Sequence, residues 1–145
     1  MRIVIASDHA GFDLKHAVRR HLVDAGHEVV DLGPDEKARC DYPDYAEKVG
    51  HEVASGAADL GFLCCGTGVG MSMAANKVHG VRAAVVSDSF SARATREHND
   101  CNVLCLGERV VGVGLALQIV DAFLGATFEG GRHAGRVNKI MDLER

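Results

Sequence analysis

The stretch from Phe62 to Lys77, FLCCGTGVGMSMAANK, combines an apolar run, a glycine-rich loop and a short helical pattern. The apolar run ends in two adjacent cysteines, and three glycines follow within five positions. Continuous apolar runs are typical of strands that are buried on both faces of a sheet, and glycines allow the backbone to approach another group closely. The stretch therefore predicts a buried strand, a tight loop lying against a ligand, and a helix.

The same alternation of strand and helix recurs along the whole chain. Buried strands are predicted at 2–7, 27–33, 59–65, 81–87 and 102–107. Helical spacing or helix-starting residues follow each of them, ending in a closing helix from about Arg132, while 34–42 and 96–100 are expected to be loops. Five strands alternating with helices predict an α/β fold in which helices cover both faces of a parallel sheet.

Length, charge and apolar runs exclude several classes of protein. The 145 residues suit one domain over 1–145, and 47% apolar residues can build a substantial core. With a formal charge of −4 and no basic tract, nucleic acid is not expected as a partner. No apolar run reaches the roughly 20 residues that a membrane span needs. The N-terminus lacks the features of a signal peptide, so a cytoplasmic location is expected.

Five cysteines, none in a Cys-x-x-Cys pair, argue against a disulfide framework and against a cysteine-based zinc site. Most of these thiols are expected to be small buried side chains. Because side chains alternate along a strand, Cys64 and Cys65 should face opposite sides of the sheet. Cys65 is the exception to the structural interpretation, because it adjoins the glycine loop.

Parallel α/β sheets bind ligands at the carboxyl ends of their strands. Asp8 and His9 follow the first predicted strand, Cys65 the third, and Arg109 lies just after the fifth. His98, with Asn99, precedes the fifth strand and is expected to join the same polar cluster. Side chains of such different chemistry at one edge predict a small-molecule site.

The glycine loop, Gly66 to Gly70, matches neither the dinucleotide fingerprint nor a Walker loop. Its backbone amides can still form a nest for a phosphate or a developing oxyanion, and a plain strand–helix turn is the alternative. A thiol beside such amides tends towards thiolate, so Cys65 could act as nucleophile or base unless it is a buried structural cysteine.

Three further side chains can carry charge or protons. His98 can exchange a proton near neutral pH, or it can be a solvated surface residue. Arg132 and Arg136 are four residues apart, so they share one helical face and suit bidentate binding of a phosphate. A solvated helix terminus is the alternative for these two arginines.

Taken together, the segments SDHAGFDLK, DYPDYA, CCGTGVGMSMAANK, REHNDCNVLCLGERVVG and EGGRHAGRV resemble, in order and spacing, the ribose-5-phosphate isomerase B family. That family includes the galactose-6-phosphate isomerase subunits and allose-6-phosphate isomerase. The resemblance implies a Rossmann-like three-layer α/β/α sandwich with a five-stranded parallel sheet. It also implies a homodimer, with a tetramer left open, whose active sites lie at the subunit interface and whose C-terminal helix takes part in the contacts.

The resemblance implies aldose–ketose isomerisation of a sugar phosphate through a cis-enediolate, without metal or cofactor. Cys65 would be the base that moves a proton between C1 and C2, Thr67 would support it, and His98 would help to open the sugar ring. The implied substrate-binding residues contact the enediolate, the sugar oxygens or the phosphate, in part across the dimer: Asp8, His9, Tyr42, Gly66, Gly68, Val69, Gly70, Asn99, Arg109, Arg132 and Arg136.

Several alternatives remain at this stage. One branch of the family uses a glutamate base and lacks the loop cysteine, whereas this chain matches the cysteine branch through Cys65. Ribose 5-phosphate and ribulose 5-phosphate are the expected substrates, but allose 6-phosphate, galactose 6-phosphate or a tetrulose phosphate would use the same residues. A non-catalytic sugar-phosphate sensor and an enzyme with a thiol nucleophile are the other two interpretations.

Overall fold

The computed structural model describes residues 1–144, which contain one sheet of five parallel strands. The strands lie in the order β2-β1-β3-β5-β4. Their bounds are β1 (Arg2–Ser7), β2 (Glu28–Asp31), β3 (Leu60–Cys65), β4 (Ala83–Val85) and β5 (Val103–Gly107). Because β2 and β3 lie on opposite sides of β1, the chain reverses its direction of winding between β1 and β3. Sheets of this kind bind ligands beyond the carboxyl ends of the strands at such a point.

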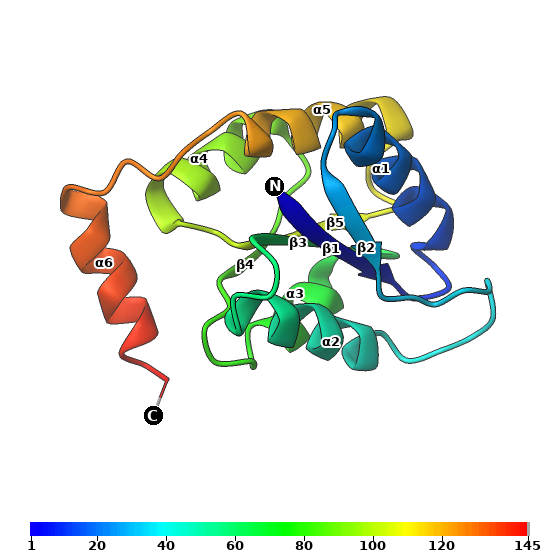
Figure 1. Ribbon diagram of the computed structural model, residues 1–145, viewed down its shortest axis with the longest axis horizontal. Coiled ribbons are helices and arrows are strands. Elements are labelled where there is room, and N and C mark those ends of the chain that lie inside the picture. The colour runs from blue at the N-terminus through cyan, green and yellow to red at the C-terminus, as the bar shows by residue number, and fades with distance from the viewer. Residues whose placement is uncertain (145) are drawn as a thin grey trace.

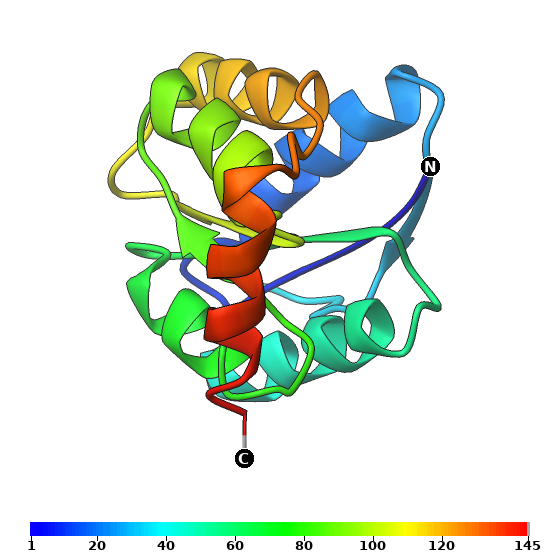
Figure 2. The same ribbon diagram turned by 90° about the vertical axis from the view of Figure 1, so that its left-hand side faces the viewer.

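Six helices surround the sheet within the described residues: α1 (Phe12–Asp24), α2 (Tyr42–Ala54), α3 (Val69–Ala75), α4 (Ser89–Asn99), α5 (Val113–Leu124) and α6 (Arg132–Met141). Helices α1, α4 and α5 cover one face, and α2 and α3 cover the other (Figure 1). The predicted α/β/α sandwich is confirmed. Helix α6 departs from the layers and runs past the β4 edge of the sheet, as Figure 2 shows.

The central strand β3 explains why both faces are covered. All six of its residues are buried, as its continuous apolar sequence predicts. The side chain of Cys64 lies in the core beneath α1 and α5, and that of Cys65 lies in the core beneath α2 and α3. The predicted divergence of the two thiols is therefore confirmed. It places Cys65, and not Cys64, on the side of the sheet that α3 covers, next to the glycine loop.

The loop predicted at 96–100 is wrong, because α4 continues through Asn99 and ends at Asp100, which has a φ of 48°. The segment is polar, which suggested a loop. Its charges are instead spaced for ion pairs along a helix: Arg93 pairs with Glu97 at 2.7 Å, and Arg96 pairs with Asp100 at 2.9 Å. Such pairs four residues apart stabilise a helix whose apolar stripe is narrow.

The second and fourth strands are shorter than predicted: they span Glu28–Asp31 and Ala83–Val85, where 27–33 and 81–87 were expected. Among residues 1–144 no helix has both the length and the apolar character required to cross a lipid bilayer.

Candidate active site

Cys65 ends β3 at the edge where the strands finish, with 5% of its surface exposed. Its Sγ accepts a hydrogen bond from the backbone N–H of Gly68 at 3.1 Å. Gly68 has a φ of +79°, a left-handed conformation that glycine adopts without strain, and it caps the N-terminus of α3. The turn therefore folds back on the sulfur and aims a backbone N–H at it. Thr67 Oγ1 accepts from the N–H of Val69 at 3.2 Å, which fixes the loop.

Tyr42 forms one wall of the site because Gly70, opposite its ring, has no side chain. A Cβ on Gly70 would lie 2.6 Å from the Tyr42 ring, so only glycine allows this approach. Tyr42 begins α2, and Pro43 follows it in the first turn, where a missing N–H is tolerated. The start of α2 and the start of α3 are thereby held together beside Cys65.

The loop after β1 provides a carboxylate and an imidazole. Because Ser7 pairs with Cys64 in the sheet, Asp8 and His9 emerge next to Cys65. Asp8 is buried, and its Oδ1 accepts from the N–H groups of Ala10 at 2.9 Å and Gly11 at 3.0 Å. His9 Nδ1 accepts from the N–H of Cys40 at 3.3 Å. These hydrogen bonds do not use the second carboxylate oxygen of Asp8 or the Nε2 of His9.

Arg109 places a cation above the glycine loop. Its N–H donates to the carbonyl of Gly66 at 3.0 Å, and a Cβ on Gly66 would lie 3.5 Å from the Arg109 guanidinium. These groups surround a cavity of about 490 Å³. Its lining residues come from the ends of β1, β3 and β5 and the starts of α2 and α3: Asp8, His9, Ala10, Tyr42, Cys65, Gly66, Thr67, Val69, Gly70, Met73 and Arg109.

Five predicted site residues do not line this cavity: Gly68, His98, Asn99, Arg132 and Arg136. Gly68 still reaches Cys65 through its backbone N–H. The expectation that His98 and Asn99 join the carboxyl-end cluster of their own chain is wrong. Helix α4 leaves the carboxyl end of β4 and runs back towards the start of β5, so its last turn lies at the amino ends of the strands. The two arginines lie on α6, beyond the β4 edge (Figure 2).

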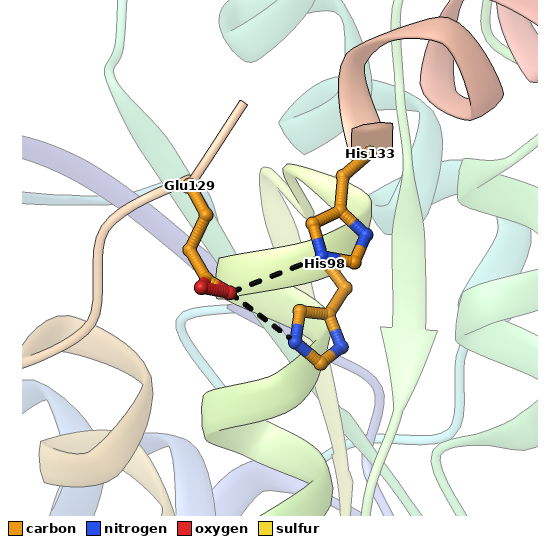
Figure 3. A group of neighbouring side chains, drawn as sticks. All are labelled: His98, Glu129 and His133. Carbon is orange, nitrogen blue, oxygen red and sulfur yellow. Dashed lines mark ion pairs between the residues drawn. The ribbon is translucent and has the colours of Figure 1, made fainter. Parts of the chain in front are cut away.

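His98 instead belongs to a second polar cluster with Glu129 and His133, shown in Figure 3. The two imidazole rings stack with centroids 4.3 Å apart and planes 14° apart. Glu129 Oε1 lies 3.4 Å from His98 Nε2 and 3.9 Å from His133 Nε2. Burial, together with the neighbouring His98 and Arg132, lowers the pKa of His133.

The sequence pattern alone predicts no role for Glu129 or His133, although the motif EGGRH contains both. Their spacing of four residues was the available signal, because it allows two side chains to meet on one turn of a helix. Their approach to His98 was not predictable, because it depends on how the segment before α6 packs on the end of α4. There the N–H of Glu129 donates to the carbonyl of Glu97 at 3.0 Å.

A larger hollow, about 680 Å³, lies between α2 and the segment after α3. Pro43, Glu47, His51, Lys77 and His79 contribute to its lining. It has no thiol beside a glycine loop and no arginine. Volume alone therefore does not identify the site, whereas the combination of Cys65, the loop amides and Arg109 does.

Comparison with known proteins agrees with this assignment of the site. A sequence profile described as Ribose/Galactose Isomerase matches residues 3–140. The ribose-5-phosphate isomerase B of Escherichia coli is 54% identical over 144 residues, which cover 99% of this chain and 97% of that protein.

Solved structures show the same similarity. The ribose-5-phosphate isomerase B of Clostridium thermocellum superposes with a TM-score of 0.98 at 54% identity, covering 99% of this chain and 97% of that one. The enzyme of Mycoplasma genitalium with bound ribulose 5-phosphate superposes with a TM-score of 0.95 at 50% identity, covering 99% and 95% of the two chains.

Proposed function

The chain belongs to the ribose/galactose isomerase family and is a sugar-phosphate isomerase, and from this premise we propose that it interconverts ribose 5-phosphate and ribulose 5-phosphate through a cis-enediolate, with Cys65 as the base. The observation that carries this proposal is the sulfur of Cys65, which lies at the floor of the cavity with a backbone N–H aimed at it. Relatives that bear this substrate in their names share about half of their residues with the chain over nearly its full length.

The reaction moves one proton between neighbouring carbons. A thiolate at Cys65 takes the proton from C2 of the open-chain aldose, the electrons move onto the carbonyl oxygen, and an enediolate forms. The hydroxyl proton passes from O2 to O1, the same thiol returns its proton to C1, and the ketose results. The N–H of Gly68 stabilises the sulfur while it is ionised, and Thr67 holds the turn that carries this N–H.

The enediolate carries negative charge on oxygen, so it needs donors that are in place before the charge develops. The loop from Gly66 to Gly70 supplies backbone amides around the cavity, and the Arg109 guanidinium lies above it. Asp8 and His9 are placed to bind sugar or phosphate oxygens, and Tyr42 limits the width of the cavity. No role in these steps requires a metal ion.

The ring-opening acid and the remaining phosphate ligands come from a second copy of the chain in this proposal. His98, Asn99, Arg132 and Arg136 lie away from the Cys65 cavity in one chain. In a two-fold dimer the same surface patch of both subunits forms the interface. The residues around Cys65 of one chain can therefore face the partner's His98. Exposed apolar side chains at the β4 edge near the Cys65 cavity support such an interface: Val69, Met73, Val85 and Phe90.

Helix α6 takes part in this dimer in our proposal. It projects from the layers of its own chain (Figure 1) and is anchored at its far end, where the N–H of Gly80 donates to Glu144 at 2.9 Å and Arg82 contacts the sulfur of Met141. Because α6 is fixed in this way, it can hold Arg132 and Arg136 at the partner's cavity without a loss of conformational entropy at each turnover. The whole of 1–145 then acts as one isomerase domain per subunit.

The test is a coupled isomerase assay with purified protein on four-, five- and six-carbon sugar phosphates. We expect the highest kcat/KM with ribose 5-phosphate and ribulose 5-phosphate. A higher value with allose 6-phosphate, galactose 6-phosphate or a tetrulose phosphate would keep the chemistry and overturn the substrate. Tight binding without turnover of any of them would favour a sugar-phosphate sensor.

A further inference from the structure

Within residues 1–144, one group of three side chains has the composition and spacing of a metal-binding site: His98, Glu129 and His133. One nitrogen or oxygen from each lies within 4.8 Å of the others. Figure 3 shows both imidazoles beside the same carboxylate oxygen. The group comes from two segments, the last turn of α4 and the turn that starts α6, so it depends on the tertiary fold.

His133 provides an independent sign that a ligand is missing from the group. It is 8% exposed, and its Nε2 is buried without a hydrogen-bond partner. The nearest carboxylate oxygen, on Glu129, is 3.9 Å away, which is too far for a hydrogen bond. Buried polar atoms nearly always have a partner, so an orphan that faces two other ligand atoms requires an explanation.

We propose that His98, Glu129 and His133 bind one divalent transition-metal ion of the zinc class, and that the bound ion inhibits the isomerase. Zinc bound tetrahedrally by nitrogen and oxygen at 2.0–2.2 Å would hold its ligand atoms roughly 3.4 Å apart. Glu129 Oε1 lies 3.4 Å and 3.9 Å from the two histidine nitrogens, close to this value, and the third separation is within 4.8 Å. The His98 side chain is partly exposed, so it can turn out of its stack with His133 and direct a lone pair at the ion.

The surrounding charge selects the kind of ion. Arg132 and Arg136 lie on the same helix as His133 and raise the local potential, which disfavours an ion held mainly by its charge. Magnesium and calcium also prefer oxygen ligands, of which this group offers one residue. Zinc, cobalt and nickel bind imidazole strongly, and this group offers two imidazoles.

Inhibition follows from the use of His98, and this part rests on the proposed function. A nitrogen of His98 bound to the ion cannot exchange a proton with the ring oxygen of the sugar. The ion would also add positive charge and bulk beside the arginines that bind the phosphate. The proposed isomerisation steps use no metal ion. Metal-free enzyme should therefore have the same activity with and without an added chelator.

The test measures zinc binding by titration calorimetry on chelator-treated full-length protein at neutral pH, beside the isomerase rate at the same zinc concentrations. Glu129→Gln and His133→Asn each remove one ligand with little change in size. His51→Asn is the matched control, because His51 and Glu47 form an exposed pair four residues apart at 3.4 Å without a second histidine. Cys65→Ser tests for binding by the thiol. Circular dichroism and thermal unfolding confirm that each variant folds.

We expect one zinc ion per chain, and affinity lower in both ligand variants by at least the roughly 10–100-fold that loss of a supporting residue costs at metal sites. The His51 and Cys65 variants should bind as the unaltered protein does, and cobalt should give visible d–d bands without a thiolate charge-transfer band. Absence of stoichiometric binding, or an affinity in both ligand variants equal to that of the unaltered protein, would overturn the metal site.

The activity arm separates the metal site from the proposed function. Zinc should lower the rate of the unaltered enzyme in step with its occupancy, and EDTA should restore that rate. Binding that depends on Glu129 and His133 but leaves the isomerase rate unchanged would overturn the inhibition and the role of His98, while the site would stand. A protein that binds zinc as expected but isomerises no sugar phosphate would contradict the proposed function alone.

Discussion

Replacing Cys65 with alanine should abolish most isomerase activity while leaving the fold intact. Cys65 is 5% exposed at the end of β3, and its sulfur accepts one hydrogen bond within the chain, from the N–H of Gly68. Its loss should cost about 1 kcal/mol of folding free energy. Loss of a general base lowers the rate by about 10²–10⁴-fold, which corresponds to about 2.7–5.4 kcal/mol of transition-state stabilisation. The catalytic effect therefore exceeds the structural one.

Cys64→Ala is the matched control, because the two thiols are neighbours on one strand and face opposite cores. Cys64 is fully buried, and this burial raises its pKa far above the ordinary value, so it stays protonated. Removing its sulfur leaves a small cavity and should cost about 1 kcal/mol of stability. The cavity at Cys65 is untouched, so kcat and KM should stay close to those of the unaltered enzyme.

The assay follows both net isomerisation and exchange of the C2 proton of the aldose with deuterium from solvent. Both depend on the same proton abstraction, so Cys65→Ala should lose them together while it still binds the sugar phosphate. Equal losses of activity in the two variants would contradict the role of Cys65 as the base, because the effect would then come from packing. Retained exchange in Cys65→Ala would show that another group is the base.

Arg132→Ala and Arg136→Ala should each weaken binding of ribose 5-phosphate roughly tenfold to a hundredfold, because a charged hydrogen bond contributes about 1.5–3 kcal/mol; saturation curves that match the unaltered enzyme would contradict this. Lys15→Met should lower the free energy of unfolding by about 3 kcal/mol, because it leaves Asp31 without the buried ammonium that lies 3.1 Å away. Denaturant titration measures this loss, and a change under 1 kcal/mol would argue against a stabilising pair. Asp88→Ala should destabilise the protein at neutral pH, because hydrogen bonds from the first turn of α4 lower the pKa of this carboxyl. Because the pKa of Asp88 is lower in the folded state than in the unfolded state, its carboxylate stabilises the fold above the ordinary pKa, and this stabilisation is lost as the pH falls through the folded-state pKa. The unfolding temperatures of the two proteins should therefore converge in acid. A difference that persists there would contradict the role of Asp88 as a helix cap.

The fold was predictable because its main signals are local. Apolar runs such as the one that ends at Cys65 are too continuous for one-sided burial, and each is followed by a helix, so a covered parallel sheet was the consistent solution. The alternation of side chains along β3 was enough to separate Cys64 from Cys65. The end of α4 was not predictable from polarity, because ion pairs along a helix and a polar loop have the same composition.

The site was predictable only in part. Asp8, Cys65 and Arg109 follow strands, so the parallel sheet itself brings them to one edge. His98 precedes a strand, and a parallel sheet places that position at the opposite edge, which the sequence analysis overlooked. Its partners Glu129 and His133 depend on packing between distant segments. The homodimer and the cytoplasmic location stay predictions.

The most direct test of a site shared between two copies is complementation between inactive variants. Cys65→Ala and His98→Asn should each be nearly inactive alone. In a mixed dimer one site carries both changes and the other carries neither, so random exchange of equal amounts should restore roughly 25% of the unaltered activity. The exchange is verified by mass spectrometry of differently tagged chains. Mixed dimers with no more activity than the separate variants would contradict the shared site, because Cys65 of one chain and His98 of the partner subunit would then not act together.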